Sequence, residues 1–94
     1  MDSKIKQIEC FVTGRVQLVM FRDFAQRKAR KLGIVGIVEN LPNGSVKVIA
    51  QGTEEKLFKF ISCLKNGPIL AKVKNVSVRW TESDGFFEDF EIVY

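Results

Sequence analysis

The sequence IVGIVENLPNGSVKVIA occupies residues 34–50 and contains two apolar segments separated by a turn. Residues 34–38 and 45–50 are rich in β-branched side chains, which favour strands. Pro42-Asn43-Gly44 lies between them and is a typical turn sequence. The pattern predicts a β-hairpin in the middle of the chain. The segments on either side of this hairpin therefore decide the topology.

Upstream of the hairpin, the sequence changes from a strand-like to a helix-like period. Residues 5–13 alternate between apolar and polar side chains, which predicts a strand with one strongly apolar face. The following Gly14-Arg15-Val16-Gln17 is expected to end that strand. Apolar residues then recur at three- and four-residue spacing and predict a helix over residues 21–32. Gly33 follows as a typical residue for the end of a helix.

Downstream of the hairpin, a second helix and two strands are predicted. Thr53 is a suitable N-cap, and two glutamates follow it in the first turn, where the helix dipole favours acids. The buried stripe of this helix ends at Asn66-Gly67-Pro68. Residues 76–80 alternate and predict a fourth strand, and residues 90–94 predict a short last one.

The predicted order is strand, helix, strand, strand, helix, strand, with a short extra strand at the C-terminal end. This order is typical of the split βαβ arrangement. Right-handed crossovers place both helices on one face of a mainly antiparallel sheet. The predicted fold class is therefore α+β, a two-layer ferredoxin-like sandwich. With 94 residues, we expect one domain over residues 1–94.

The composition excludes several classes of function. Hydrophobic residues make up 46% and charged residues 28%, as in globular proteins. The absence of histidine excludes Ser-His-Asp and Cys-His catalysis. Cys10 and Cys63 are too few for a disulfide scaffold or a four-cysteine zinc site. These absences exclude metal sites that need an imidazole or four cysteines, and we expect no cofactor. Without a signal peptide or an apolar run long enough for a membrane span, we expect a cytoplasmic location and no membrane partner.

The charge distribution is uneven. The formal net charge is +4, all 15 bases lie in residues 1–81, and none lies among the five acids of residues 82–94. A basic cluster could contact nucleic acid, a membrane surface or a small anion, although a solvated helix face explains it as well. The cluster consists of Arg22, Arg27, Lys28, Arg30 and Lys31.

The junction between the first strand and the first helix is the best candidate for a binding site. Such a junction presents free backbone N–H groups, and the helix dipole adds partial positive charge. Successive amides can form an anion-binding nest, and the Arg22 guanidinium suits phosphate or carboxylate. The alternative is an ordinary connection between two elements. The predicted phosphate-binding loop comprises Gly14, Arg15, Val16, Gln17, Leu18, Val19 and Met20.

Nearly the whole chain resembles the acylphosphatase family. The segment GRVQLVMFR at residues 14–22 is similar to the phosphate-loop signature of that family. The segments GIVEN at residues 36–40 and NGSV at residues 43–46 are similar to its second signature. The ending FEIVY at residues 90–94 also matches. Several motifs in the same order are more specific than any one of them.

The resemblance implies hydrolysis of the carboxyl–phosphate bond of an acyl phosphate to a carboxylate and inorganic phosphate, without a metal. Arg22 matches the phosphate-binding arginine, and Asn40 matches the asparagine that orients the attacking water. The amides of residues 16–20 would hold the phosphoryl oxygens. The terminal carboxylate of Tyr94 could support Arg22. The implied partners are a small acyl phosphate and, as product or inhibitor, inorganic phosphate or sulfate; we expect a monomer that binds no nucleic acid.

This chemistry suits a protein without histidine. An acyl phosphate loses a carboxylate whose acid has a pKa of about 4, so the leaving group needs no proton at neutral pH. Phosphoryl transfer depends mainly on positioning and charge stabilisation. Asn40 is not a useful base, so its predicted role is to orient water.

Leu18 departs from the family pattern, which usually has glycine there. A leucine in the left-handed region would cost about 1–2 kcal/mol, and its side chain could cover part of the loop. We therefore expect Leu18→Gly to raise kcat/KM, and a weakly active or inactive anion-binding domain is the alternative function. A second alternative is an RNA-recognition module, but residues 45–50 have no aromatic side chain on which a base could stack.

Overall fold

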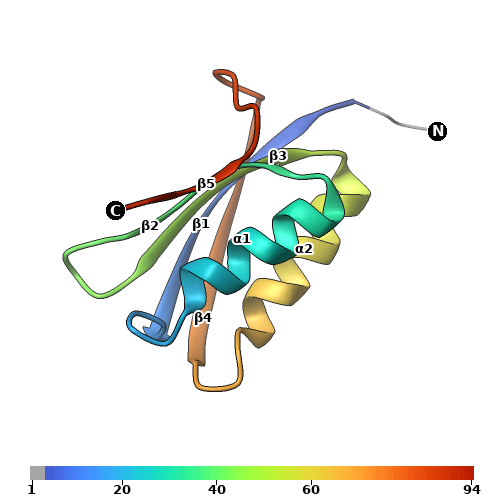
Figure 1. Ribbon diagram of the computed structural model, residues 1–94. Coiled ribbons are helices and arrows are strands. Elements are labelled where there is room, and N and C mark those ends of the chain that lie inside the picture. The colour runs from blue at the N-terminus through green and yellow to red at the C-terminus, as the bar shows by residue number, and fades with distance from the viewer. Residues whose placement is uncertain (1–3) are drawn as a thin grey trace.

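A five-stranded sheet carries two helices on one of its faces (Figure 1). The computed structural model describes residues 4–94. The elements are β1 (Lys6–Arg15), α1 (Phe21–Leu32), β2 (Val35–Asn40), β3 (Val46–Gly52), α2 (Glu54–Asn66), β4 (Lys72–Thr81) and β5 (Phe90–Val93). The strand order is β4-β1-β3-β2-β5, and only the pair β2–β5 is parallel. The predicted ferredoxin-like sandwich is confirmed.

The core lies between the sheet and the helices. Along β1 and β3 every second side chain is apolar and faces the helices, as predicted for the first strand. The rings of Phe60 on α2 and Phe90 on β5 meet edge to face, with centroids 5.6 Å apart. The fully buried large side chains include Ile8, Val12, Phe21, Ile34, Val38, Val48, Leu57, Phe60, Leu64 and Phe90. This packing fixes the position of α1 over the sheet.

The expected helix ends are confirmed. Gly33 is left-handed, with φ of 73°, and its N–H donates to the carbonyl of Arg30. The next amide, of Ile34, donates to the carbonyl of Ala29, and the two hydrogen bonds together form a Schellman motif. The Thr53 hydroxyl accepts from the N–H of Lys56 at 3.5 Å. Local sequence signals thus fix where α1 ends and where α2 begins.

Several strand boundaries differ from the prediction; β2 and β3, predicted over residues 34–38 and 45–50, continue to Asn40 and Gly52. The first strand was expected to end at residue 13, which is wrong, because β1 continues through Arg15 after a register shift between Thr13 and Gly14. Gly14 has φ of 119°, and a Cβ there would lie 2.2 Å from the Lys72 carbonyl oxygen, so only glycine permits this bulge. β4 begins at Lys72 instead of residue 76 because this exposed edge strand has little apolar alternation at its start.

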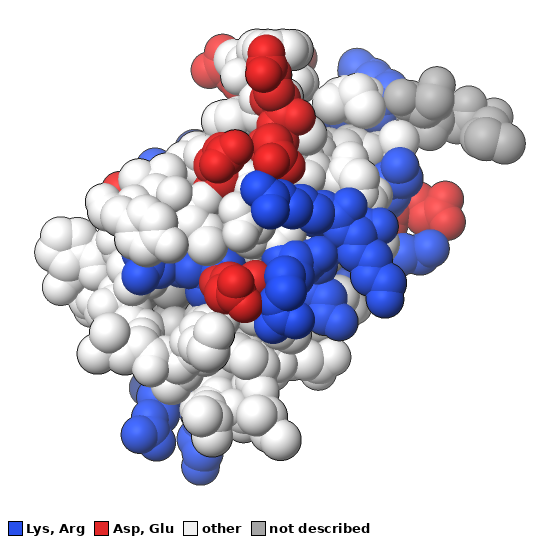
Figure 2. All heavy atoms as spheres, in the orientation of Figure 1, with Lys and Arg blue, Asp and Glu red and all other residues white. Residues whose placement is uncertain are grey.

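Ion pairs account for part of the predicted basic cluster. Arg27 pairs with Asp23 at 3.0 Å, and Arg30 pairs with Asp89 at 2.8 Å. Figure 2 shows these bases gathered over α1 with acids beside them. The arrangement supports the solvated helix face. Neither helix of the described chain is long and apolar enough to cross a membrane.

Candidate active site

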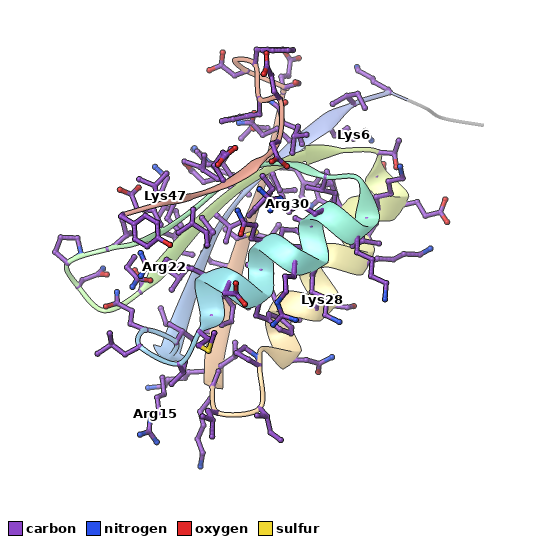
Figure 3. The ribbon with its side chains drawn as sticks, in the orientation of Figure 1. Lys6, Arg15, Arg22, Lys28, Arg30 and Lys47 are labelled. Atoms are coloured by element: carbon purple, nitrogen blue, oxygen red, sulfur yellow. The ribbon has the colours of Figure 1, made fainter. Side chains whose placement is uncertain are left out.

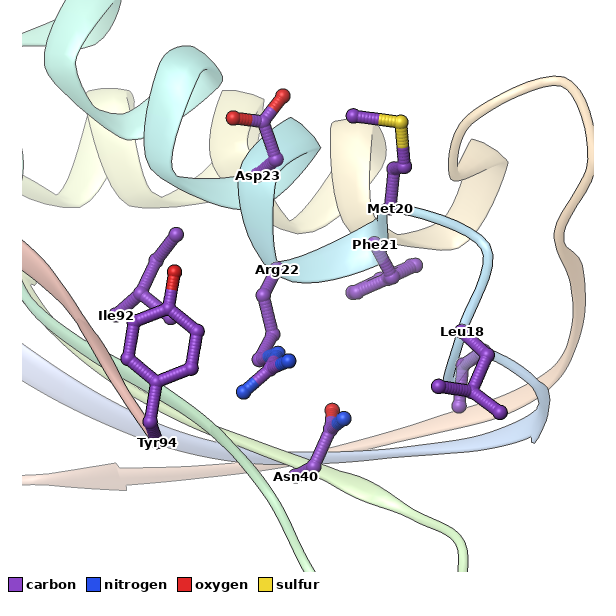
Figure 4. Close-up of a pocket in the computed structure, with 9 residues that line it drawn as sticks. Leu18, Met20, Phe21, Arg22, Asp23, Asn40, Ile92 and Tyr94 are labelled. Atoms are coloured by element: carbon purple, nitrogen blue, oxygen red, sulfur yellow. The ribbon is translucent and has the colours of Figure 1, made fainter.

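A cavity of about 400 Å³ lies where the β1–α1 loop faces the end of β2 and the C-terminal residues (Figure 4). Its size suits a small-molecule ligand. The residues that line it are Val16, Leu18, Met20, Phe21, Arg22, Asp23, Asn40, Ile92 and Tyr94. The structure therefore brings together Arg22 and Asn40, which are on different elements and were both predicted as site residues.

The backbone of the loop has unused hydrogen-bond donors. Within residues 4–94, the N–H groups of residues 16–20 donate to no backbone or side-chain acceptor. The N-terminal end of α1 directly follows them and adds partial positive charge. Unpaired amides next to a helix N-terminus favour an anion. This arrangement supports the predicted role of residues 16–20.

Gln17 ties the loop to the β2–β3 hairpin. Its Nε2 donates to the carbonyl of Leu41 at 2.8 Å and to the carbonyl of Ser45 at 2.9 Å. Leu41 directly follows Asn40, and Ser45 lies across the turn, just before β3. The contact therefore positions the loop against the strand that carries Asn40, a role that sequence reasoning did not assign to Gln17.

Arg22 lies in the first turn of α1 with its guanidinium in the cavity. Its Nη1 donates to the carbonyl of Val93 at 3.4 Å, and its Cζ lies 4.8 Å from the centre of the Tyr94 ring. In the described chain, no ion pair joins Arg22 to a carboxylate, the terminal one of Tyr94 included. The neighbouring Asp23 pairs with Arg27 instead. The positive charge of Arg22 is therefore available to an anion.

Asn40 ends β2 and faces Arg22 across the cavity (Figure 4). Its Oδ1 is buried and has no hydrogen-bond partner among the described residues. A buried oxygen of this kind costs free energy unless something donates to it. The side chain is therefore suited to accept a hydrogen bond from a molecule in the cavity.

Leu18 and Met20 both have left-handed backbones, with φ of 60° and 61°. Such a conformation is unfavourable for residues with a side chain. The Leu18 side chain is 97% exposed, so it lies at the rim and does not fill the cavity. Of the two effects expected at this position, the structure contains the backbone strain and not the covering of the loop.

Four residues of the predicted loop do not line the cavity: Gly14, Arg15, Val19 and Gln17, whose side chain instead contacts the hairpin. Gly14 and Arg15 belong to strand β1, and the Arg15 side chain points away from Arg22 (Figure 3). Val19 packs against the core. Three lining residues were missed: Phe21, Asp23 and Ile92. Adjacency to Arg22 was the available signal for the first two, and alternation with Tyr94 was the signal for the third.

The thiol of Cys10 is not a nucleophile in this fold. Burial, with a smaller contribution from the charge of Glu9, raises its pKa to about 12. The protonated thiol therefore packs as a small apolar group. Within residues 4–94, no three His, Cys, Asp or Glu side chains are grouped closely enough to hold a metal ion.

On this ferredoxin-like sandwich, backbone N–H groups without an acceptor lie beside Arg22, which has no ion pair within residues 4–94; this arrangement favours a small phosphate-handling protein. Comparison with known families is consistent with this class, since the family model described as Acylphosphatase matches residues 8–92. The chain belongs to the acylphosphatase family.

Two acylphosphatases match this chain over most of their own length, and one longer protein matches it over a small part. An acylphosphatase of Archaeoglobus fulgidus is 48% identical over 93% of this chain and 97% of its own. The crystal structure of acylphosphatase from Bacillus subtilis superposes with a TM-score of 0.92 at 38% identity, covering 97% of this chain and 100% of the other. A structure of full-length HypF in the phosphate- and nucleotide-bound form is 29% identical with a TM-score of 0.90; it covers 100% of this chain, which spans only 12% of the HypF chain.

Proposed function

We propose that this cavity is where the chain hydrolyses acyl phosphates, the reaction of the family to which it belongs. The observation that carries the proposal is the opposition of Arg22, which has no ion pair within residues 4–94, and the buried, unpartnered Oδ1 of Asn40. One group attracts an anion and the other accepts a hydrogen bond. Both face the same space as the loop backbone.

The phosphoryl group binds between the loop and Arg22. The N–H groups of residues 16–20 and the guanidinium donate to its equatorial oxygens, where negative charge is spread during transfer. These donors are held before the substrate arrives, by the Gln17 contacts and by the Val93 carbonyl that accepts from Arg22. Preorganised donors stabilise the transition state without a further reorganisation cost.

Asn40 orients the attacking water. Its Oδ1 accepts one O–H of the water, which directs a lone pair of the water oxygen at phosphorus. The new P–O bond forms as the bond between phosphorus and the carboxyl oxygen breaks. The carboxylate leaves without a proton because the pKa of its acid, about 4, lies well below neutral pH, and the proton of the water passes to a phosphoryl oxygen of the substrate. This scheme needs no general acid and no metal.

Release of phosphate from benzoyl phosphate tests this function. The purified protein should release inorganic phosphate both without added metal and in the presence of EDTA. Absence of release would contradict acyl phosphate hydrolysis in this chain. Release that EDTA abolishes would leave the hydrolysis standing and contradict the metal-independent scheme.

The strain at Leu18 favours a second candidate, in which the loop binds anions but hydrolyses weakly. We expect Leu18→Gly to raise kcat/KM by up to roughly tenfold, because a left-handed leucine costs about 1–2 kcal/mol and a 1.36 kcal/mol change is tenfold in rate. Steady-state kinetics on benzoyl phosphate measure this. Ile69→Gly is the matched control, since Ile69 is equally exposed without a left-handed backbone. An unchanged or lower value for Leu18→Gly would show that the leucine is not a handicap.

A further inference from the structure

Four large apolar side chains project from two loops without covering the core. Leu18 and Met20 on the β1–α1 loop are 97% and 70% exposed. Ile69 and Leu70 on the α2–β4 connection are 98% and 71% exposed. Single exposed apolar residues are common, but several at neighbouring loop tips mark an interaction surface.

The two loops lie at the same end of the molecule. β1 and β4 are paired, and their register places Arg15, just before the first loop, opposite Lys72, just after the second. Figure 1 shows both loops beyond the same end of the sheet. The four side chains therefore form one surface, here called the loop-tip patch (Leu18, Met20, Ile69 and Leu70).

The surroundings of the loop-tip patch are basic. No acid occurs in residues 10–22 or in residues 56–81, which form the two loops and their flanks. Four exposed bases flank the patch, and none of them takes part in an ion pair within residues 4–94. In Figure 2 the lower end shows blue and white atoms but no red ones. These bases are Arg15, Lys65, Lys72 and Lys74.

The acidic C-terminal part lies at the opposite end. β4 has ten residues, so the connection after Thr81 lies roughly 30 Å from Lys72. That connection carries Glu82, Asp84 and Glu88 (Figures 1 and 2). The uneven charge along the sequence thus places bases at one end of the folded molecule and acids at the other. A negatively charged surface would therefore attract the end that carries the loop-tip patch.

We propose that the loop-tip patch docks on the surface of an anionic lipid bilayer. The aliphatic tips enter the interface between headgroups and acyl chains, and the flanking bases lie at the lipid phosphates. Nucleic acid fits less well, because aliphatic tips offer no ring on which bases stack. Leu18 and Met20 also line the cavity, so docking would place its rim at the membrane. The proposal revises the expectation of no membrane partner and does not depend on the reaction at the cavity.

Co-sedimentation with vesicles tests this docking. The protein should bind vesicles of phosphatidylglycerol and phosphatidylcholine more strongly than phosphatidylcholine alone, and added salt should weaken the binding. The double variant Ile69→Ser, Leu70→Ser should lower the partition coefficient by roughly tenfold or more, because two exposed aliphatic side chains no longer enter the bilayer. These two residues do not line the cavity, so hydrolysis of benzoyl phosphate in solution should be unchanged and reports that the variant is folded.

Phe86→Ser is the matched control, because Phe86 is 82% exposed at the acidic end. Its binding to vesicles should equal that of the unmodified protein. Equal binding of the double variant, or no preference for the anionic vesicles, would overturn the proposal. Binding to single-stranded RNA in place of vesicles would also overturn it and assign the surface to a nucleic acid.

Discussion

Arg22→Ala is expected to lower kcat/KM on benzoyl phosphate by at least roughly 10³-fold. Loss of one donor in a preorganised anion site costs about 10²–10³-fold, and Arg22 also supplies a charge that no carboxylate of the described residues neutralises. Inhibition by inorganic phosphate should disappear as well, because the same guanidinium binds product. Initial rates and phosphate inhibition constants measure both effects.

Arg30→Ala is the control for that substitution. Arg30 lies on the same helix and pairs with Asp89, away from the cavity. Its loss should leave kcat/KM within roughly twofold, since an exposed ion pair contributes little. If Arg22→Ala retained phosphate inhibition and most of its activity, the phosphoryl group would have to bind elsewhere.

Asn40→Ala is expected to lower kcat by at least about 10²-fold, with a smaller change in KM. The split follows from its role, because Asn40 acts on the water in the transition state and the phosphoryl group is bound by other residues. The variant should be at least as stable as the unmodified protein, since it removes a buried oxygen without a partner. Urea unfolding and steady-state kinetics of the same sample test both statements.

Asn43→Ala is a control with the opposite expected outcome. The Asn43 Oδ1 accepts from the backbone N–H of Ser45 at 3.0 Å and from its hydroxyl at 2.6 Å. Its loss should lower the free energy of unfolding by about 1–3 kcal/mol and change kcat little. A variant of Asn40 that lost stability and kept kcat would contradict its assignment as the residue that orients water.

Much of the fold followed from short-range patterns. The Pro42-Asn43-Gly44 turn, the Gly33 helix end and the Thr53 cap each depend on residues close together in the chain, and all three are confirmed. The boundaries that were wrong include the end of β1, after the bulge at Gly14, and the start of β4. Both depend on pairing between distant strands, so no local period indicated them.

Only part of the candidate site could be predicted from the sequence. Arg22 and Asn40 were chosen from motifs, and the structure places both at one cavity. Asp23 pairs with Arg27 at the i,i+4 spacing of a helix, a signal present in the sequence, but the pairing was not predicted; Arg22 has no ion pair among the described residues. The tie of Gln17 to the hairpin was also unforeseen, because its acceptors are backbone carbonyls of another segment.

The sequence alone determined the order of the elements, the turn and the helix ends, and it predicted an anion-binding loop before Arg22. These features depend on contacts between near neighbours in the chain, which composition and spacing encode directly. Only the tertiary structure decided that Asn40 faces Arg22, that the Leu18 side chain leaves the cavity open, and that Leu18 and Ile69 share one basic end. Those relations follow from sheet order and strand register, which bring together groups that are far apart in the chain.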